Sequence, residues 1–155
     1  MSIIHRARRL GGTVLAVAAL ALGAVVAAPT AQAASYNGAC GSGYVARDHI
    51  DIWSPATAGP DAPLAHLGTV WLTYNSSTGK NCTVTIREHP NSTKIFIYTW
   101  LCISGTDKCA DQGNYFTTFA GPVFLSAAHK CIDWGGSIDG PITDQSVERY
   151  HEHCG

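Results

Sequence analysis

The sequence predicts an all-β domain, a small disulfide-stapled antiparallel β-sandwich or barrel-like fold. Three observations predict this class: several short segments alternate between apolar and polar residues, turn residues separate them at short intervals, and six cysteines lie within residues 34–155. No segment has a clear helical period, although residues 144–151 fit one short helix. Many short strands at this spacing favour a sandwich or barrel over a helical bundle.

Residues 1–33 differ from the rest of the chain and are typical of a secretory signal peptide. Three arginines precede an apolar run over residues 10–28, and Ala31-Gln32-Ala33 follows as a small-residue cleavage motif. The alternative is an uncleaved membrane anchor, since the apolar run is long enough to span a bilayer. Its high Ala, Gly and Val content and the cleavage motif favour removal. We therefore expect one secreted, extracellular domain of residues 34–155, with no further segment long enough to cross a membrane.

The charge of residues 34–155 excludes one class of partner. Seven Lys and Arg stand against eleven Asp and Glu, a net charge of −4 with histidine neutral. Nucleic-acid binding needs a basic surface that displaces counterions, so this composition argues against it. Simple electrostatic attachment to anionic wall polymers is disfavoured for the same reason.

The clearest predicted element is a β-hairpin of residues 69–74 and 82–87. Both segments alternate with a period of two and are rich in β-branched and aromatic residues. A three-residue turn over residues 77–79, with its glycine in the left-handed conformation, fixes the expected register. In this register two pairs share one face: Thr73 with Thr83, and Trp71 with Thr85.

Further strands are expected where β-branched and aromatic residues gather between turn signals. Their expected bounds are residues 95–103, 115–119, 123–127 and 131–134. The proline-rich residues 52–65 are expected to form a surface loop.

The cysteines predict three disulfides, because an even number in a small exported domain normally pairs. They are Cys40, Cys82, Cys102, Cys109, Cys131 and Cys154. A zinc site is not favoured, since no C-x-x-C pair occurs, and a nucleophilic thiolate would need an unpaired cysteine. Cys102 and Cys109 form the easiest pair, because a two-residue turn at Gly105-Thr106 places them opposite each other in a hairpin.

Five sequence blocks carry a family resemblance. They are residues 36–44, 72–75 with 79–82, 120–123, 131–136 and 153–155, of which Cys-Ile-Asp-Trp-Gly-Gly at 131–136 is the most specific. Together they resemble the spore-associated protein A family, small exported proteins of sporulating filamentous bacteria. The resemblance implies export and association with the spore surface, and it supplies no catalytic residues.

The resemblance also bears on the disulfides. The family pattern has counterparts of four cysteines, Cys40, Cys82, Cys131 and Cys154, but not of the other two. This implies that the 102–109 pair is a separate local staple and that the other four pair among themselves. We favour Cys40–Cys82 with Cys131–Cys154, and a peptide that links Cys40 to Cys131 would refute this assignment. The proline-rich residues 52–65 look like an insertion relative to the family spacing.

Few residues suggest catalysis or metal binding. His151 and His153 share a face if the chain is extended there, and the fold would have to bring in a third metal ligand such as His129. We expect a solvated chain end instead, with no metal and no cofactor. A glycosidase would need a carboxylate pair, and the candidates are Asp133, Asp139, Glu148 and Glu152. No G-x-S-x-G motif supports a serine nucleophile, so we expect no catalytic residues and no enzyme activity.

Aromatic residues offer the remaining functional signal. Flat aromatic rings stack on pyranose sugars, and Trp71 is predicted to share a hydroxyl-rich face with Thr73, Thr83 and Thr85 as a ligand platform. We expect a secreted, non-catalytic protein whose partners are spore or cell-wall surface components. A carbohydrate- or cell-wall-binding module is the first alternative, and a small secreted hydrolase is the second.

The signal peptide and the cysteines together predict the mass of the exported protein. The chain recovered outside the cell should begin at Ala34, and its intact mass should be six hydrogens below that of the fully reduced chain. Intact-mass spectrometry with and without reduction measures both quantities. Extracellular protein that retains Arg6, Arg8 and Arg9 would contradict the prediction.

Overall fold

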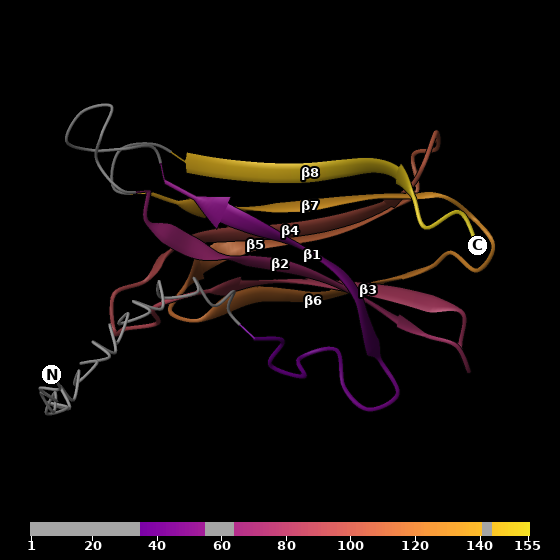
Figure 1. Ribbon diagram of the computed structural model, residues 1–155, viewed down its shortest axis with the longest axis horizontal. Helices are drawn as coiled ribbons and strands as arrows, with labels where there is room; N and C mark the ends of the chain where they lie inside the picture. The colour runs from indigo at the N-terminus through magenta and orange to yellow at the C-terminus, as the bar shows by residue number, and fades with distance from the viewer. Residues whose placement is uncertain (1–34, 55–63, 141–143) are drawn as a thin grey trace, which may run out of the picture. The chain divides into compact units, whose positions relative to one another are not determined.

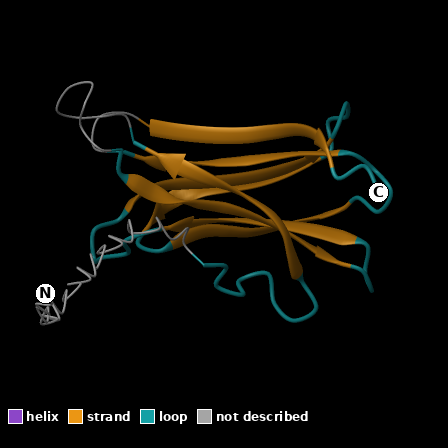
Figure 2. Cartoon of the chain, viewed as in Figure 1, coloured by secondary structure: helices purple, strands orange, loops and turns teal. Residues whose placement is uncertain are grey.

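A computed structural model describes residues 35–54, 64–140 and 144–155, which form eight strands (Figure 1). In chain order they are β1 (Val45–Trp53), β2 (His66–Asn75), β3 (Lys80–Arg87), β4 (Ile95–Ile103), β5 (Cys109–Phe116), β6 (Phe119–Ser126), β7 (Ile132–Asp139) and β8 (Asp144–Glu152). The described residues contain no helix, so none of them forms a helical membrane span (Figure 2). The predicted signal peptide lies outside the described residues.

The strands form two antiparallel sheets that pack face to face. The first sheet has the order β1-β2-β3-β6 and the second has the order β5-β4-β7-β8. Between them lies one apolar core, whose members include the fully buried Val70, Leu72, Ile97, Leu101 and Trp134. The all-β sandwich class predicted from the sequence is therefore confirmed.

Strand β4 has the predicted bounds, whereas other elements differ. Residues 144–151, expected as a short helix, lie in β8, because alternate side chains point to opposite faces and the backbone pairs with β7. Strand β5 ends at Phe116, so the strand expected at 115–119 straddles the turn between β5 and β6. Strand β1 was not predicted, and it includes the buried Ile52 from the expected loop. Residues 55–63 of that loop lie outside the described residues.

The β2–β3 hairpin has a register one residue away from the predicted one. Its loop contains four residues, 76–79, and Asn75 pairs with Lys80. The Asn75 side-chain oxygen accepts hydrogen bonds from the backbone N–H groups of Ser77 (3.0 Å) and Thr78 (3.2 Å). This asparagine-centred turn accommodates the extra residue. A shift of one residue moves every side chain of one strand to the opposite face of the sheet, relative to the side chains of its partner strand.

The shifted register turns Thr83 and Thr85 toward the second sheet. Thr83 Oγ1 donates a hydrogen bond to the carbonyl oxygen of Trp100 (3.4 Å), and Thr85 Oγ1 donates one to that of Tyr98 (2.9 Å). Both threonines are fully buried. The sheets approach closely here because Gly136 lacks a side chain: a Cβ at this position would collide with Thr85 Oγ1 and the Tyr98 carbonyl.

Three disulfides are present, and no described cysteine is free. Cys40–Cys82 fastens the segment before β1 to the first sheet, and Cys102–Cys109 joins directly opposed residues of β4 and β5. Cys131–Cys154 fastens the C-terminal residues to the start of β7. These pairs are the three favoured from the sequence.

The hydrogen bond from Thr85 to β4 predicts a measurable loss of stability. Thr85→Val keeps the shape of the side chain but removes the donor, so the free energy of unfolding should fall by about 1–2 kcal/mol. Urea or guanidinium unfolding with intact disulfides measures this change. Thr118→Val, at an exposed position between β5 and β6, is the control and should stay within about 0.5 kcal/mol of the parent. Equal effects of the two substitutions would contradict the prediction.

Candidate functional site

The outer face of the second sheet carries a row of aromatic rings, which we call the aromatic face. Along β4 the side chains of Phe96, Tyr98 and Trp100 point outward, because they alternate with the buried Ile97, Thr99 and Leu101. The outward positions are two residues apart, so the α-carbons of Phe96 and Trp100 are separated by about 13 Å.

Two glycines in the neighbouring strands leave room for the β4 rings beside them. Gly113 of β5 pairs with Tyr98, and Gly135 of β7 pairs with Trp100. A Cβ at Gly113 would lie 2.7 Å from Tyr98 Cδ2 and 3.0 Å from Phe96 Cζ, and one at Gly135 would lie 2.9 Å from Trp100 Nε1. These contacts are too short for real side chains. The β4 rings therefore cover the backbone of the adjacent strands where side chains are missing.

Tyrosines extend the row on both sides of β4. Tyr115 of β5 contacts Phe96 edge-to-face with ring centroids 5.8 Å apart, and Tyr150 of β8 lies 6.1 Å from Trp100. Each of these two tyrosines is 59% exposed. The aromatic face thus crosses all of the sheet from β5 to β8 and is open to solvent at both margins.

Carboxylates surround the aromatic rings. Strand pairing places five of them on this face: Asp111, Asp133, Asp139, Asp144 and Glu148. The four strands contain a single Lys or Arg, Arg149, which is directed to the opposite face, 3.5 Å from Glu152. The aromatic face therefore has only negative charges on its strands.

Two of these carboxylates hold phenol groups in place. Burial raises the pKa of Tyr98 above its ordinary value of 10.0, and the charge of Asp111 and a hydrogen bond to it add to this effect. The pKa of Tyr150 is raised mainly by a hydrogen bond to Glu148. Both phenols therefore remain protonated donors at neutral pH.

The platform predicted around Trp71 does not exist in the predicted form. Thr83 and Thr85 lie on the opposite face of the first sheet and are fully buried, and Thr73 is fully buried as well. Trp71 is half-buried: its ring stacks on His49 at 4.9 Å and contacts Tyr36 at 6.1 Å. The one-residue difference in the hairpin register is the reason for this correction.

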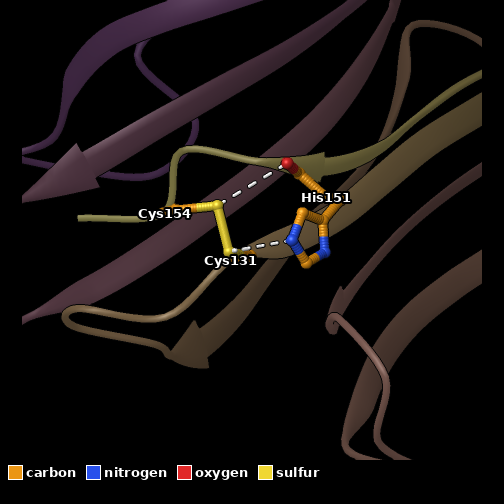
Figure 3. Close-up of side chains that lie close together, drawn as sticks. All are labelled: Cys131, His151 and Cys154. Carbon is orange, nitrogen blue, oxygen red and sulfur yellow. Dashed lines mark hydrogen bonds between the residues drawn. A yellow bond between two sulfur atoms is a disulfide. The ribbon is translucent and has the colours of Figure 1, made fainter.

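The histidines near the C-terminus do not share a face. His151 and His153 both have left-handed backbone conformations, with φ of 56° and 51°, so the chain is not extended there. His151 Nε2 lies 3.7 Å from Cys131 Sγ, and Cys154 Sγ lies 3.6 Å from the His151 carbonyl oxygen (Figure 3). The sulfurs are joined in a disulfide, so they are not thiolate ligands.

His153 takes part in a separate group of charges. Its Nε2 atom lies 3.5 Å from Asp48 Oδ2, while Glu152 Oε1 lies 3.5 Å from the Arg149 guanidinium. Asp48, Glu152 and His153 offer ligand atoms within 4.8 Å of one another. His129 does not join this group, although it lines a cavity of about 420 Å³ together with His153. These contacts link the C-terminal tail to β1.

The four carboxylates considered for a glycosidase have different hydrogen-bond partners, although Asp133 and Glu148 both lie close enough to the Tyr150 phenol to raise its pKa. Asp133 Oδ1 accepts hydrogen bonds from Ser104 Oγ (2.5 Å) and from the His151 backbone N–H (2.7 Å). Asp139 pairs with Asp144, Glu148 bonds to Tyr150, and Glu152 pairs with Arg149 on the other face.

The comparisons with known proteins identify a relative of similar length. No protein-family model and no solved structure matches the chain. Spore-associated protein A of Streptomyces coelicolor is 40% identical over 153 residues, which cover 94% of this chain and 88% of the relative. The chain belongs to the spore-associated protein A family. Because 94% of the chain is aligned, the family likeness extends to both sheets.

The aromatic face of this member of the spore-associated protein A family was not predicted from the sequence. The signal was present: in the predicted strand 95–103, large aromatic residues alternate with Ile, Thr and Leu. The sequence pattern did not show which set would face the core. It also could not show that Gly113 and Gly135 would lie beside the rings.

The raised pKa of Asp139, which is paired with Asp144, predicts that replacing Asp139 by asparagine will increase stability in a pH-dependent way. Burial raises the pKa of Asp139 above its ordinary value of 3.8, and a hydrogen bond to Asp144 and the charge of Asp144 raise it further. A hydrogen bond from the Phe96 backbone N–H lowers this pKa and so opposes the shift. Arg87 and Lys94 line the same cavity as Asp139. A raised carboxyl pKa favours folding below pH 3.8, and this contribution is lost as the pH rises through the raised pKa.

Asp139→Asn removes the charge at every pH and should therefore be more stable than the parent at pH 7. The difference should shrink toward zero at about pH 3, where Asp139 is protonated in both states. Urea unfolding at the two pH values measures it. Asp107→Asn, in the exposed turn before β5, is the matched control and should show no such gain. A loss of stability for Asp139→Asn at pH 7 would contradict the prediction.

Proposed function

We propose that this protein is exported and acts without catalysis at the spore or cell surface. The observation that carries the proposal is the 40% identity, over 94% of the chain, to a protein named for its association with spores. The signal-peptide pattern of residues 1–33 and three disulfides support export to an oxidising compartment. Spore or cell-wall components are the proposed partners.

The arrangement of the described side chains supports a non-catalytic role. Every described cysteine is in a disulfide, which leaves no thiolate nucleophile among them. The candidate carboxylates have separate partners, and Asp133 already accepts two hydrogen bonds. A hydrolase needs an acid and a base or nucleophile that face one substrate. The hydrogen bonds of Asp133, and the bond of Glu148 to the Tyr150 phenol, favour a structural role for these carboxylates.

A carbohydrate- or cell-wall-binding module remains the second candidate function, and a specific observation favours it. We now place the binding site of such a module on the aromatic face instead of around Trp71, because Tyr115 and Tyr150 are each 59% exposed there. Soluble proteins seldom expose several large rings together unless the surface binds a partner.

Attachment to spores should resist salt, because residues 34–155, with a net charge of −4, gain nothing from electrostatic adhesion to anionic polymers. Washing protein-coated spores with NaCl up to about 1 M should leave most of the protein bound, as measured by immunoblotting. A basic protein adsorbed to the same spores is the control and should be released. Release of this protein by moderate salt would refute non-electrostatic attachment, and turnover in a glycan or peptide hydrolysis screen would refute the non-catalytic role.

A further inference from the structure

We propose that the aromatic face binds an uncharged, β-linked pyranose polymer, whose sugar rings stack along β4 on Phe96, Tyr98 and Trp100. The inference rests on the proposed function, since it names the class of surface component that the protein would recognise. Four features of the aromatic face support it: the line of rings, its flatness, its charge and its hydrogen-bonding groups.

The line of rings matches an extended polymer better than a small molecule. Three rings of β4 follow one another at every second residue, over about 13 Å between the first and last α-carbons. A β-1,4-linked pyranose chain is an extended ribbon that exposes the C–H groups of its sugar rings as flat apolar patches. Stacking these patches on aromatic rings removes apolar surface from water on both partners.

The flatness of the surface admits such a ribbon. At Gly113 and Gly135 no side chain rises beside the β4 rings, and the short distances to a hypothetical Cβ show that the rings occupy this space. The flanking Tyr115 and Tyr150 add exposed rings on both sides, inclined by 73° to Phe96 and by 44° to Trp100, so the flat strip is the β4 row itself. A curved α-linked glucan could not contact the whole row at once.

Charge selects against anionic partners and favours hydroxyl donors. The strands bring five carboxylates and no Lys or Arg side chain to this face. Carboxylates accept strong hydrogen bonds from sugar hydroxyls, whereas they repel phosphate, sulfate or uronate groups. Asp111 and Glu148, at the margins of the row, bond to the hydroxyls of Tyr98 and Tyr150 and have further acceptor capacity for a sugar.

The outer face of the first sheet carries its rings in separate groups rather than along one strand, and the 41% exposed Phe124 contacts Tyr44 there. Trp71 stacks on His49 and contacts Tyr36, and the Cys40–Cys82 disulfide fastens the segment before β1 to this sheet. Trp71 therefore provides a matched control: a tryptophan of the same protein, half-buried in the same way as Trp100, on the other sheet.

Binding to insoluble chitin, an uncharged β-1,4-linked polymer of N-acetylglucosamine, tests the proposal. The exported protein with intact disulfides is mixed with chitin, and depletion from solution gives the affinity. Trp100→Ala should weaken binding by about tenfold or more, whereas Trp71→Ala should leave it within about twofold of the parent. Gly113→Ala keeps every ring but displaces Tyr98 and Phe96, so it should also weaken binding. Tyr98→Phe, which keeps the ring, should retain most of it.

Two exposed positions keep the test valid if Trp100→Ala fails to fold. Tyr115→Ala and Tyr150→Ala remove rings that are 59% exposed, so both variants should fold and bind chitin more weakly. Near-ultraviolet circular dichroism checks the fold of each variant. Starch, an α-linked glucan, and polygalacturonate, an anionic polymer, are the polymer controls and should bind much less.

The outcomes separate this inference from the proposed function. Chitin binding that depends on the aromatic face and resists about 1 M NaCl supports the inference. Binding to spores without binding to chitin overturns the inference and leaves surface association standing. Chitin binding that is lost in Trp71→Ala but not in Trp100→Ala overturns the assigned face, and equal binding to polygalacturonate overturns the charge argument. Failure to bind either spores or chitin overturns both proposals.

Discussion

The hydrogen bonds from Thr83 and Thr85 to the carbonyls of Trp100 and Tyr98 are the contacts on which the arrangement of the two sheets depends. Side chains of one sheet reach the backbone of the other only where the sheets approach closely. Gly136 permits this approach, because any Cβ there would collide with Thr85. Both threonines are fully buried, so these polar contacts lie within the apolar core and satisfy groups that would otherwise be costly to bury.

The same contacts link the core to the proposed binding surface. Tyr98 and Trp100 accept hydrogen bonds through their backbone on the inner side of β4, while their side chains form the aromatic face on the outer side. The Cys102–Cys109 disulfide joins β4 to β5 two register pairs beyond Trp100 and Asp111. The rings thus lie on a strand that is held on its inner side and at one end, and in the proposed complex this would reduce the entropy lost on binding.

The two sheets differ in how their outer faces are used. The first sheet is fastened to the N-terminal segment by Cys40–Cys82, and its tryptophan is engaged by His49 and Tyr36. The second sheet combines exposed aromatic rings with carboxylates and has no cationic side chain from its strands on that face. This difference in charge and in the arrangement of the rings is the basis for proposing the second sheet as the binding surface.

The sequence by itself determined the all-β class, strand β4 and the local pairing of Cys102 with Cys109, because alternation and turn residues act over short distances. It also carried the blocks that identify the family. Only the tertiary structure decided the hairpin register, because the Asn75 side chain stabilises a four-residue loop in place of the predicted three-residue turn. This register in turn directs Thr83 and Thr85 inward. Strand β8 is likewise set by pairing with β7, which overrides a weak helical preference. The aromatic face required both sheets, because burial of one side of β4 is what leaves Phe96, Tyr98 and Trp100 on the other.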